Sequence, residues 1–151
     1  MIRFATAADT GALAALRRAW VEENQGSAVA DDGFEDAFGA WYAAEQGRRV
    51  TWIAEADGSC VGMLNMLVFS RMPRPGRAPN QWGYLANFYV LAEHRVTGTG
   101  TALLAACTAY ADEHGFVRIV LSPSERSVPL YERSGFGPAT SLMLRPGPAE
   151  A

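Results

Sequence analysis

A strand-like run that leads through a glycine-containing turn into a helix is the part of the sequence best suited to chemistry. Residues 84–91 are mostly apolar, with aromatic and β-branched side chains, and strong helix formers begin at Thr101. Arg95, Gly98 and Gly100 lie between the two segments. Glycines at a helix start let backbone N–H groups surround an anion, and the unpaired first-turn donors favour phosphate there. The turn therefore predicts a site for a phosphorylated cofactor.

Two well-known phosphate loops do not match this turn. A Walker loop ends in Gly-Lys-Ser/Thr, whereas Gly100 is followed directly by Thr101, so nucleoside triphosphate hydrolysis is not supported. A dinucleotide fingerprint has a third glycine three residues further on, where Leu103 stands. For a Gly-x-Gly pattern taken alone, an ordinary strand-to-helix turn is the alternative.

A second segment, Ser124 to Phe136, carries a tyrosine and ends in Glu-x-x-Gly-Phe. Together with Arg95-x-x-Gly98-x-Gly100, it resembles the GNAT superfamily of N-acetyltransferases, in which an acetyl-CoA pyrophosphate loop is followed by a short tyrosine-bearing helix. The order and the spacing of the two segments both fit. The resemblance covers residues 82–136 by motif, and the part before them by the order of its elements.

The resemblance implies an α/β (α+β) fold, with a mixed, mostly antiparallel sheet flanked by helices. Two central parallel strands, here 84–91 and 117–121, would splay apart to admit the pantetheine arm of acetyl-CoA. Acetyl-CoA would be the co-substrate, and no metal would be required. The function implied is transfer of an acetyl group to a primary amine of a small molecule by direct attack on the thioester.

The resemblance also implies roles for individual residues. The backbone N–H of Val90 would donate to the developing oxyanion, and Tyr131 would be the general acid. The expected contacts with the co-substrate are Tyr89, Val90, Arg95, Val96, Thr97, Gly98, Thr99, Gly100, Thr101, Ser124 and Tyr131.

The sequence offers a clearer candidate for the general acid of the implied reaction than for the general base. A phenol with a pKa of about 10 stays protonated at neutral pH, so Tyr131 can donate to a departing thiolate; the alternative is a core aromatic. Many relatives carry a glutamate where Ala86 stands, and this departure leaves the base unidentified. It also motivates an alternative function, a non-catalytic acyl-CoA-binding or sensing module. A protein or peptide N-acetyltransferase is a third hypothesis.

The acceptor side is expected at Asp31, Glu35, Trp82 and Asn87. Asp31 and Glu35 open a predicted helix, where acids cap the positive end, or they contact the amine. The identity of the amine stays open.

The remaining elements must position these residues. A short strand at residues 2–4 precedes a capping-box start at Thr6 to Asp9 and an amphipathic helix. The other expected elements are a helix opening at 31–36, a hairpin of strands 50–55 and 60–69, an Arg/Pro-rich exposed loop at 71–81, a helix from 101 to 114, a short helix at 127–134 and a last strand around 142–144.

The composition narrows the function classes. A length of 151 residues predicts one domain, assigned to residues 1–146, with a frayed tail at 147–151. A net charge of −3 argues against nucleic acid as a partner, and no apolar run suits a signal peptide or a membrane span, so a cytoplasmic location is expected. Cys60 and Cys107 are expected to be unbridged. A homodimer is compatible with such a domain, but no residue pattern specifies it.

Overall fold

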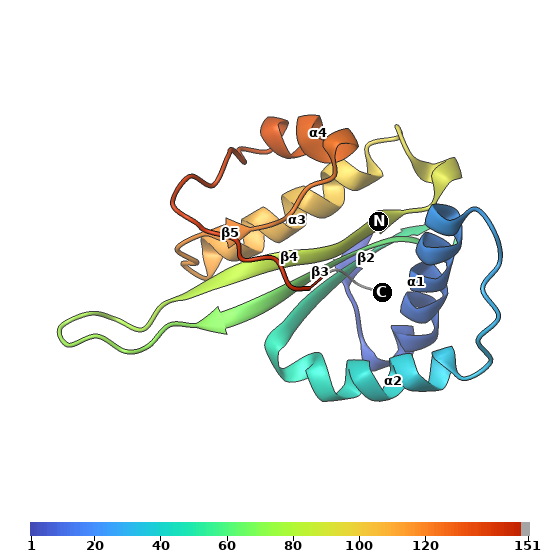
Figure 1. The fold of residues 1–151 in the computed structure, drawn as a ribbon, viewed down its shortest axis with the longest axis horizontal. Coiled ribbons are helices and arrows are strands. Elements are labelled where there is room, and N and C mark those ends of the chain that lie inside the picture. Colours follow the sequence, from blue (N-terminus) through green and yellow to red (C-terminus); the bar gives the residue numbers. More distant parts are fainter. Residues whose placement is uncertain (149–151) are drawn as a thin grey trace.

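The computed structural model describes residues 1–148 as a five-stranded sheet with helices on both faces (Figure 1). The strands are β1 (Ile2–Phe4), β2 (Arg49–Ala56), β3 (Ser59–Ser70), β4 (Gln81–Val90) and β5 (Ile119–Val120). The helices are α1 (Thr10–Gln25), α2 (Phe34–Glu45), α3 (Thr99–Glu113) and α4 (Val128–Arg133), with single 3₁₀ turns at Ala7–Asp9, Gln46–Arg48, Ala92–His94 and Glu125–Ser127.

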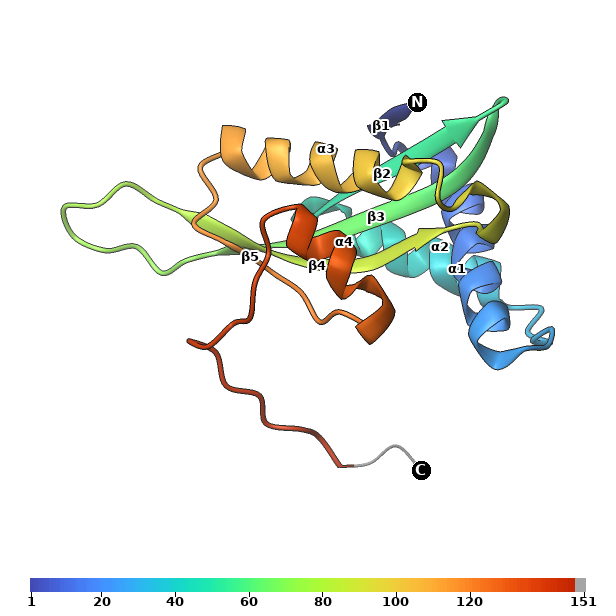
Figure 2. The ribbon, with the colours of Figure 1, turned by 90° about the horizontal axis from the view of Figure 1, so that it is seen from above.

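The sheet is mixed and mostly antiparallel, with the order β1-β2-β3-β4-β5. Only β4 and β5 are parallel, and they pair for two residues, Gly83 with Ile119 and Tyr84 with Val120. Beyond this point the chain after β5 leaves β4 (Figure 2). The expected fold class, including the splayed parallel pair, is confirmed.

The last strand expected around residues 142–144 is wrong. No strand forms there, and Leu142, Met143 and Leu144 are 38%, 102% and 89% exposed. The apolar triplet is short and lies between Pro138 and Pro146, and β5 offers it only two strand residues as a partner. The parallel pair therefore lies at one edge of the described sheet. Of the expected tail, residues 149–151 lie outside the part described.

The two faces of the sheet carry separate cores. Figures 1 and 2 show α1 and α2 on one face and α3 and α4 on the other. Successive strand residues point to opposite faces, so Trp52 packs toward α3 while Ile53 packs toward α1. The α3-side core contains Leu64, Met66, Leu85, Val90, Leu103, Leu104, Cys107 and Tyr131, and the α1-side core contains Leu13, Leu16, Tyr42, Met63 and Tyr89.

Local patterns account for the entry into α1 and for the first hairpin. The capping box at Thr6 and Asp9 is confirmed, and Arg3 of β1 also donates to the Asp9 carboxylate at 2.8 Å. The Arg3 guanidinium, with the Thr6 amide, holds the pKa of Asp9 far below its usual range. The β2–β3 hairpin turns at Asp57 and Gly58, both with positive φ, as a tight hairpin requires.

The β3–β4 hairpin extends well beyond the body of the molecule (Figure 1). Its strands end at Ser70 and resume at Gln81, so the exposed loop expected at residues 71–81 is confirmed to within one residue. At its base Trp82 stacks on Phe69 with 4.4 Å between ring centroids, and Arg118 lies over the Trp82 ring. This aromatic pair stabilises the ribbon before the loop begins.

Both cysteines are free, as expected, and burial raises the pKa of the Cys107 thiol to about 12. Over residues 1–148, the helices lack the combination of length and apolar character that crossing a bilayer requires.

Candidate active site

The glycine turn leads from β4 into the first turn of α3. Gly98 caps the helix with a φ of 88°, a left-handed conformation that glycine adopts without strain. The first intrahelical hydrogen bond runs from the amide of Ala102 to the carbonyl of Gly98, at 2.9 Å. The amides of Thr99, Gly100 and Thr101 therefore have no partner inside the helix and are available to an anion.

Side-chain hydrogen bonds hold this turn in its conformation. The Thr97 hydroxyl donates to the His94 carbonyl at 2.7 Å and lies 2.9 Å from the Thr99 hydroxyl. Val96 has a φ of 62° and is fully exposed, which is a strained conformation for a β-branched residue. The hydrogen bonds of the flanking residues Arg95 and Thr97 hold the chain on both sides of Val96, so the turn has one defined backbone conformation.

Arg95 connects the turn to the end of α1. Its Nε donates to the Val90 carbonyl at 2.8 Å, and its two terminal nitrogens donate to Glu23 at 2.6 and 2.7 Å. Tyr89 donates its hydroxyl to the same carboxylate at 2.8 Å. The Arg95 guanidinium, with the Tyr89 hydroxyl, lowers the pKa of Glu23 to about 2, while burial and then Glu23 raise the pKa of Tyr89 to about 12. In this structure all the guanidinium nitrogens of Arg95 bond to protein groups.

A β-bulge interrupts β4 beside these residues. Asn65 pairs with Ala86 and Met63 pairs with Tyr89, so one residue of β3 faces two residues of β4, Asn87 and Phe88. Asn87 has a φ of 52°, a left-handed conformation that asparagine tolerates better than most residues. Bulges of this kind redirect side chains and are frequent next to active sites.

The hydrogen-bond pattern after the bulge orients the main chain of Val90. Leu91 donates its amide to the Val61 carbonyl at 2.9 Å, which makes Leu91 and Val61 a hydrogen-bonded pair. Such pairs alternate along an antiparallel ladder, so the neighbouring pair, Val90 with Gly62, is not hydrogen-bonded. The N–H and C=O of Val90 consequently point away from β3, toward the side from which β5 has diverged.

Tyr131 lies on α4 within the α3-side core. Its ring meets Phe88 edge-on at 6.1 Å and Phe136 at 5.7 Å between centroids. Burial, with Cys107 nearby, raises the pKa of Tyr131 to about 12, so the phenol keeps its proton over the whole physiological range. Phe88 also lies 3.5 Å from the position that a Cβ on Gly100 would take, so a single ring contacts both the tyrosine and the glycine turn.

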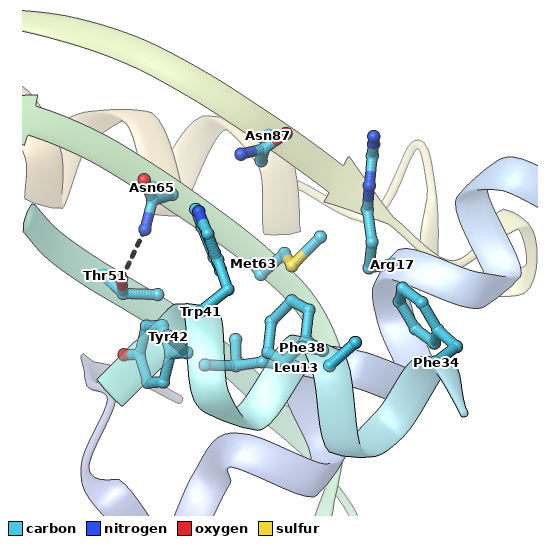
Figure 3. Close-up of a pocket in the computed structure, with 11 residues that line it drawn as sticks. Leu13, Arg17, Phe34, Phe38, Trp41, Tyr42, Thr51, Met63, Asn65 and Asn87 are labelled. Carbon is cyan, nitrogen blue, oxygen red and sulfur yellow. Dashed lines mark hydrogen bonds between the residues drawn. The ribbon is translucent and has the colours of Figure 1, made fainter. Parts of the chain in front are cut away.

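A pocket of about 350 Å³ opens on the other face of β4, and we call it the α1–α2 pocket (Figure 3). Its wall is mostly apolar, and Asn87 from the bulge is one of its polar side chains. No aspartate, glutamate or histidine is among the described residues that line it, which are Leu13, Arg17, Phe34, Ala37, Phe38, Trp41, Tyr42, Thr51, Met63, Asn65 and Asn87.

The other residues expected on the acceptor side lie outside this pocket. Glu35 is ion-paired with Arg18 at 2.8 Å, and Arg18 also donates to the carbonyl of Asp31. Trp82 lies in the aromatic pair of the β3–β4 hairpin. Ser124, which was expected to contact the co-substrate and not the acceptor, caps a 3₁₀ turn after β5, with its hydroxyl 3.0 Å from that of Ser127. Of the four expected acceptor residues, Asn87 alone lines the pocket.

Comparison with known proteins assigns the chain to a family. Residues 13–136 match the sequence model of the acetyltransferase (GNAT) family. The chain belongs to this family. The match begins in α1 and ends just after α4, so it contains the glycine turn, the bulge and Tyr131.

Individual relatives agree with this assignment. Over 82 residues the chain is 30% identical to the glucosamine 6-phosphate N-acetyltransferase of Trypanosoma brucei brucei, and it spans about half the length of that relative, 54% of each chain being matched. A GCN5-related N-acetyltransferase of Ralstonia eutropha is 26% identical, with a TM-score of 0.74 over 99% of both chains. A protein of Clostridium acetobutylicum described as a predicted acetyltransferase, solved with acetyl-CoA, is 20% identical, with a TM-score of 0.76 over 97% of this chain and 95% of that one. The last likeness concerns the fold alone.

Sequence reasoning missed most of the α1–α2 pocket. Phe34, Phe38 and Trp41 share one helix face, a pattern that also predicts ordinary packing against a sheet. Arg17 gives no local signal, because charged residues on an amphipathic helix are usually solvated. Among residues 1–148, no group of three or more His, Cys, Asp or Glu side chains is arranged to hold a metal ion.

Proposed function

We propose that the chain is an acetyl-CoA-dependent N-acetyltransferase that modifies a primary amine of a small molecule. The observation that carries this proposal is the placement of β4 between two sites. Phe88 and Val90 face the glycine turn and Tyr131, while Asn87 faces the α1–α2 pocket. A co-substrate on one side of the free edge of β4 and an acceptor on the other would meet at the bulge.

Acetyl-CoA fits the chemistry of the residues on the α3 side. The amides of residues 96–101 and the Thr101 hydroxyl would hold its pyrophosphate at the N-terminus of α3, where unpaired donors and the helix dipole favour an anion. The main chain of Tyr89 and Val90 would bind the pantetheine arm beside the splay, and Ser124 would contact its amide groups. When bound, acetyl-CoA supplies an activated acetyl thioester from which an amine can form an amide with release of the CoA thiol.

Val90 would contribute a fixed hydrogen-bond donor. Its N–H points out of the β3 ladder, so it is free to donate to a carbonyl oxygen that gains negative charge during acetyl transfer. Arg95 holds the carbonyl of the same residue at 2.8 Å. We therefore assign Arg95 a positioning role toward Val90, in addition to its expected contact with the co-substrate.

Tyr131 would supply the proton for the leaving thiol. A buried phenol with its pKa near 12 is fully protonated at neutral pH, so it can donate a hydrogen bond to the sulfur as negative charge develops there. A free thiol has an ordinary pKa of about 8.5, so full proton transfer requires that burial also disfavour the charged thiolate and raise the pKa of the thiol. Tyr131 belongs to a short helix that packs on Phe88. This packing supports a fixed position for the ring beside β4.

The α1–α2 pocket would receive the acceptor. Its volume of about 350 Å³ suits a small molecule, and Asn87 would orient the amine from the bulge. The relative from Trypanosoma brucei brucei is named for its action on glucosamine 6-phosphate, a small primary amine, which supports this substrate class.

A panel of small amines tests the proposal. The protein is incubated with acetyl-CoA and each amine, and both the free CoA thiol and the mass of the acetylated product are measured. We expect at least one amine to give both signals. Tight binding of acetyl-CoA without thiol release for every amine would instead favour the acyl-CoA-binding or sensing module.

A further inference from the structure

We propose that the acceptor is an amine that carries both a ring-bearing apolar body and an anionic group, and that Arg17 binds the anion. This inference rests on the proposed function and names the substrate class of the same pocket. An aromatic amino acid with a free carboxylate is the simplest member of this class.

The wall of the α1–α2 pocket selects the apolar body. The rings of Phe34, Phe38 and Trp41 come from one face of α2, and Leu13 and Met63 close the wall from α1 and β3 (Figure 3). The ring centroids of Phe38 and Trp41 lie 5.6 Å apart, with the two rings tilted relative to each other, so the wall is a packed aromatic surface. Burial of apolar area against such a wall contributes about 25 cal/mol for each Å² removed from water.

Few polar groups of the pocket are left for a polar ligand. Asn65 donates to the Thr51 hydroxyl at 2.7 Å, and its carbonyl oxygen accepts from Arg49 at 2.8 Å. These groups satisfy one another at the β2–β3 side of the pocket. A sugar with several hydroxyls would have to desolvate them against apolar rings, which is unfavourable without compensating hydrogen bonds.

Arg17 differs from the other arginines near the pocket. Arg18 pairs with Glu35 at 2.8 Å, and Arg49 pairs with Glu45 at 2.7 Å. Arg17 forms no ion pair with any residue of the part of the chain that the structure describes, and its guanidinium lies 4.8 Å above the Trp20 ring. A half-buried guanidinium on an apolar pocket, without a carboxylate of its own, is complementary to an anion brought by the ligand.

The arrangement also places the anion relative to the amine. Figure 3 shows the polar ends of Arg17 and Asn87 on the β4 side of the pocket, with the rings of Phe34 and Phe38 on the opposite side. An amino acid can present its carboxylate to Arg17 and its amine to Asn87 while its ring packs on the α2 wall. The pocket volume of about 350 Å³ lies in the range of ordinary small-molecule sites, so an amino acid can enter it.

Matched ligands and variants test the inference. L-phenylalanine, phenethylamine and phenylalaninamide share one aromatic ring and one primary amine, but only phenylalanine carries a carboxylate. Glucosamine 6-phosphate and 2-aminoethyl phosphate carry an anion and an amine without an aromatic ring. Each is tested for turnover, and its binding is also measured by calorimetry with wild type, Arg17→Gln and Arg77→Gln. Arg77 lies in the exposed β3–β4 loop, so this control removes the same charge far from the pocket.

We expect phenylalanine to bind best, and Arg17→Gln to weaken its binding and raise its KM about 10- to 100-fold, the range for a charge-assisted hydrogen bond. Phenethylamine should change less than about threefold, Arg77→Gln should match wild type, and CoA affinity should hold in all three proteins. Equal losses for phenylalanine and phenethylamine, or a wild-type preference for the two amines that lack a carboxylate, would overturn the assignment of Arg17. A preference for either phosphate compound would overturn the assignment of an apolar, ring-bearing body to the acceptor.

Two further readouts separate this inference from the proposed function. If no amine is acetylated although acetyl-CoA binds, the transferase proposal fails, and calorimetric binding of phenylalanine still decides the role of Arg17. Ala37→Phe adds a bulky ring at an exposed position of α2 that lines the pocket and leaves Arg17 itself unchanged. It should weaken phenylalanine binding and leave CoA affinity unchanged; unaltered phenylalanine binding would place the ligand elsewhere.

Discussion

The hydroxyl of Tyr131 carries the clearest prediction for a single atom. Tyr131→Phe keeps the ring contacts with Phe88 and Phe136 but removes the proton that the proposed acid donates. We expect the turnover rate to fall about 100-fold or more while CoA affinity and melting temperature stay near wild type. Single-turnover kinetics provide the measurement, because slow product release would mask part of the effect.

A matched control exists on α3. Tyr110→Phe removes a hydroxyl from a partly buried ring of the same core, near the C-terminal end of α3 and so at the other end of the helix from the glycine turn. Its rate should equal that of wild type. An undiminished chemical step in the Tyr131 variant would leave Tyr131 as a packing residue.

The absence of an acidic or imidazole side chain among the described pocket residues predicts the pH dependence. If no residue outside this lining acts as the base, the acceptor enters as the deprotonated amine, and the ordinary pKa of an alkylamine is about 10. The value of kcat/KM should therefore rise about tenfold per pH unit up to the pKa of the amine. Because the pKa of Tyr131 is raised to about 12, no falling limb is expected below about pH 11.

Two acceptors of different pKa distinguish the sources of this limb. If the amine itself titrates, the midpoint of the profile moves with the acceptor. A common midpoint near neutral pH for both acceptors would show that the protein supplies a base.

At the scale of elements, the start of α3 can be tested with one added side chain. Gly100→Glu places a negative charge where the first-turn amides are available, and its Cβ would lie 3.5 Å from Phe88, an ordinary contact. We expect CoA affinity to fall about 10-fold or more, equivalent to about 1.4 kcal/mol, while the protein remains folded. Titration of CoA by calorimetry, with circular dichroism as the folding check, measures both.

The second residue of α1 offers the control. Gly11 occupies the same place in α1 that Gly100 occupies in α3, and a Cβ there meets nothing within 4 Å. Gly11→Glu should leave CoA affinity unchanged. Equal affinity in the two variants would mean that the phosphate groups bind away from α3.

The link between α1 and the glycine turn should make stability depend on pH. Arg95 and the Tyr89 hydroxyl lower the pKa of Glu23 from its ordinary 4.5 to about 2. A depressed carboxyl pKa stabilises the folded state above the unfolded pKa, and this contribution is lost as pH falls through about 4.5 toward 2. Glu23→Gln should therefore lower stability by about 1 kcal/mol at pH 7, since the pair is partly exposed, and by less at low pH.

Melting temperatures at several pH values between 7 and about 2.5 measure this dependence. Glu22→Gln serves as the control, because Glu22 lies beside Glu23 but contacts the Val29 amide and Arg18. A difference between the Glu23 variant and wild type that stays constant with pH would contradict an ionic link.

For the whole molecule, the features that were predictable from the sequence are those that depend on a few consecutive residues. The capping box at Thr6, the hairpin turn at Asp57 and Gly58, and the glycine turn at Gly98 each depend on a few consecutive positions. The element order and the short tyrosine-bearing helix added the family resemblance. These local signals were sufficient for the fold class and for one side of the site.

Features that join distant segments were not predictable in the same way. Arg95 and Glu23 are 72 positions apart, and the sequence around neither residue indicates that the two side chains form an ion pair. The pocket combines α1, α2, β2, β3 and β4, and its aromatic residues look like ordinary core in the sequence. The strand wrongly expected at 142–144 is the converse case, in which a local apolar pattern lacks a strand long enough to pair with.

The bulge in β4 can also be considered as an insertion of one residue into a regular hairpin. If Asn87 were deleted, Phe88 would pair with Leu64 on the α3 face. Ala86 would still pair with Asn65, and Tyr89 would still pair with Met63. Every remaining side chain then lies on its present face. The fold itself therefore does not need Asn87, although its left-handed backbone costs about 1 kcal/mol.

Deletion of Asn87 should accordingly give a folded protein with an equal or higher melting temperature and little acetyl transfer, whereas Asn87→Gly, which keeps the bulge, should retain part of the rate. Thermal melts and the CoA-release assay compare the two proteins, and an unfolded deletion variant would refute the argument. Because the hairpin can lose Asn87 without changing its register, and because Asn87 lines the pocket, we infer that this residue serves the proposed acceptor site and not the fold.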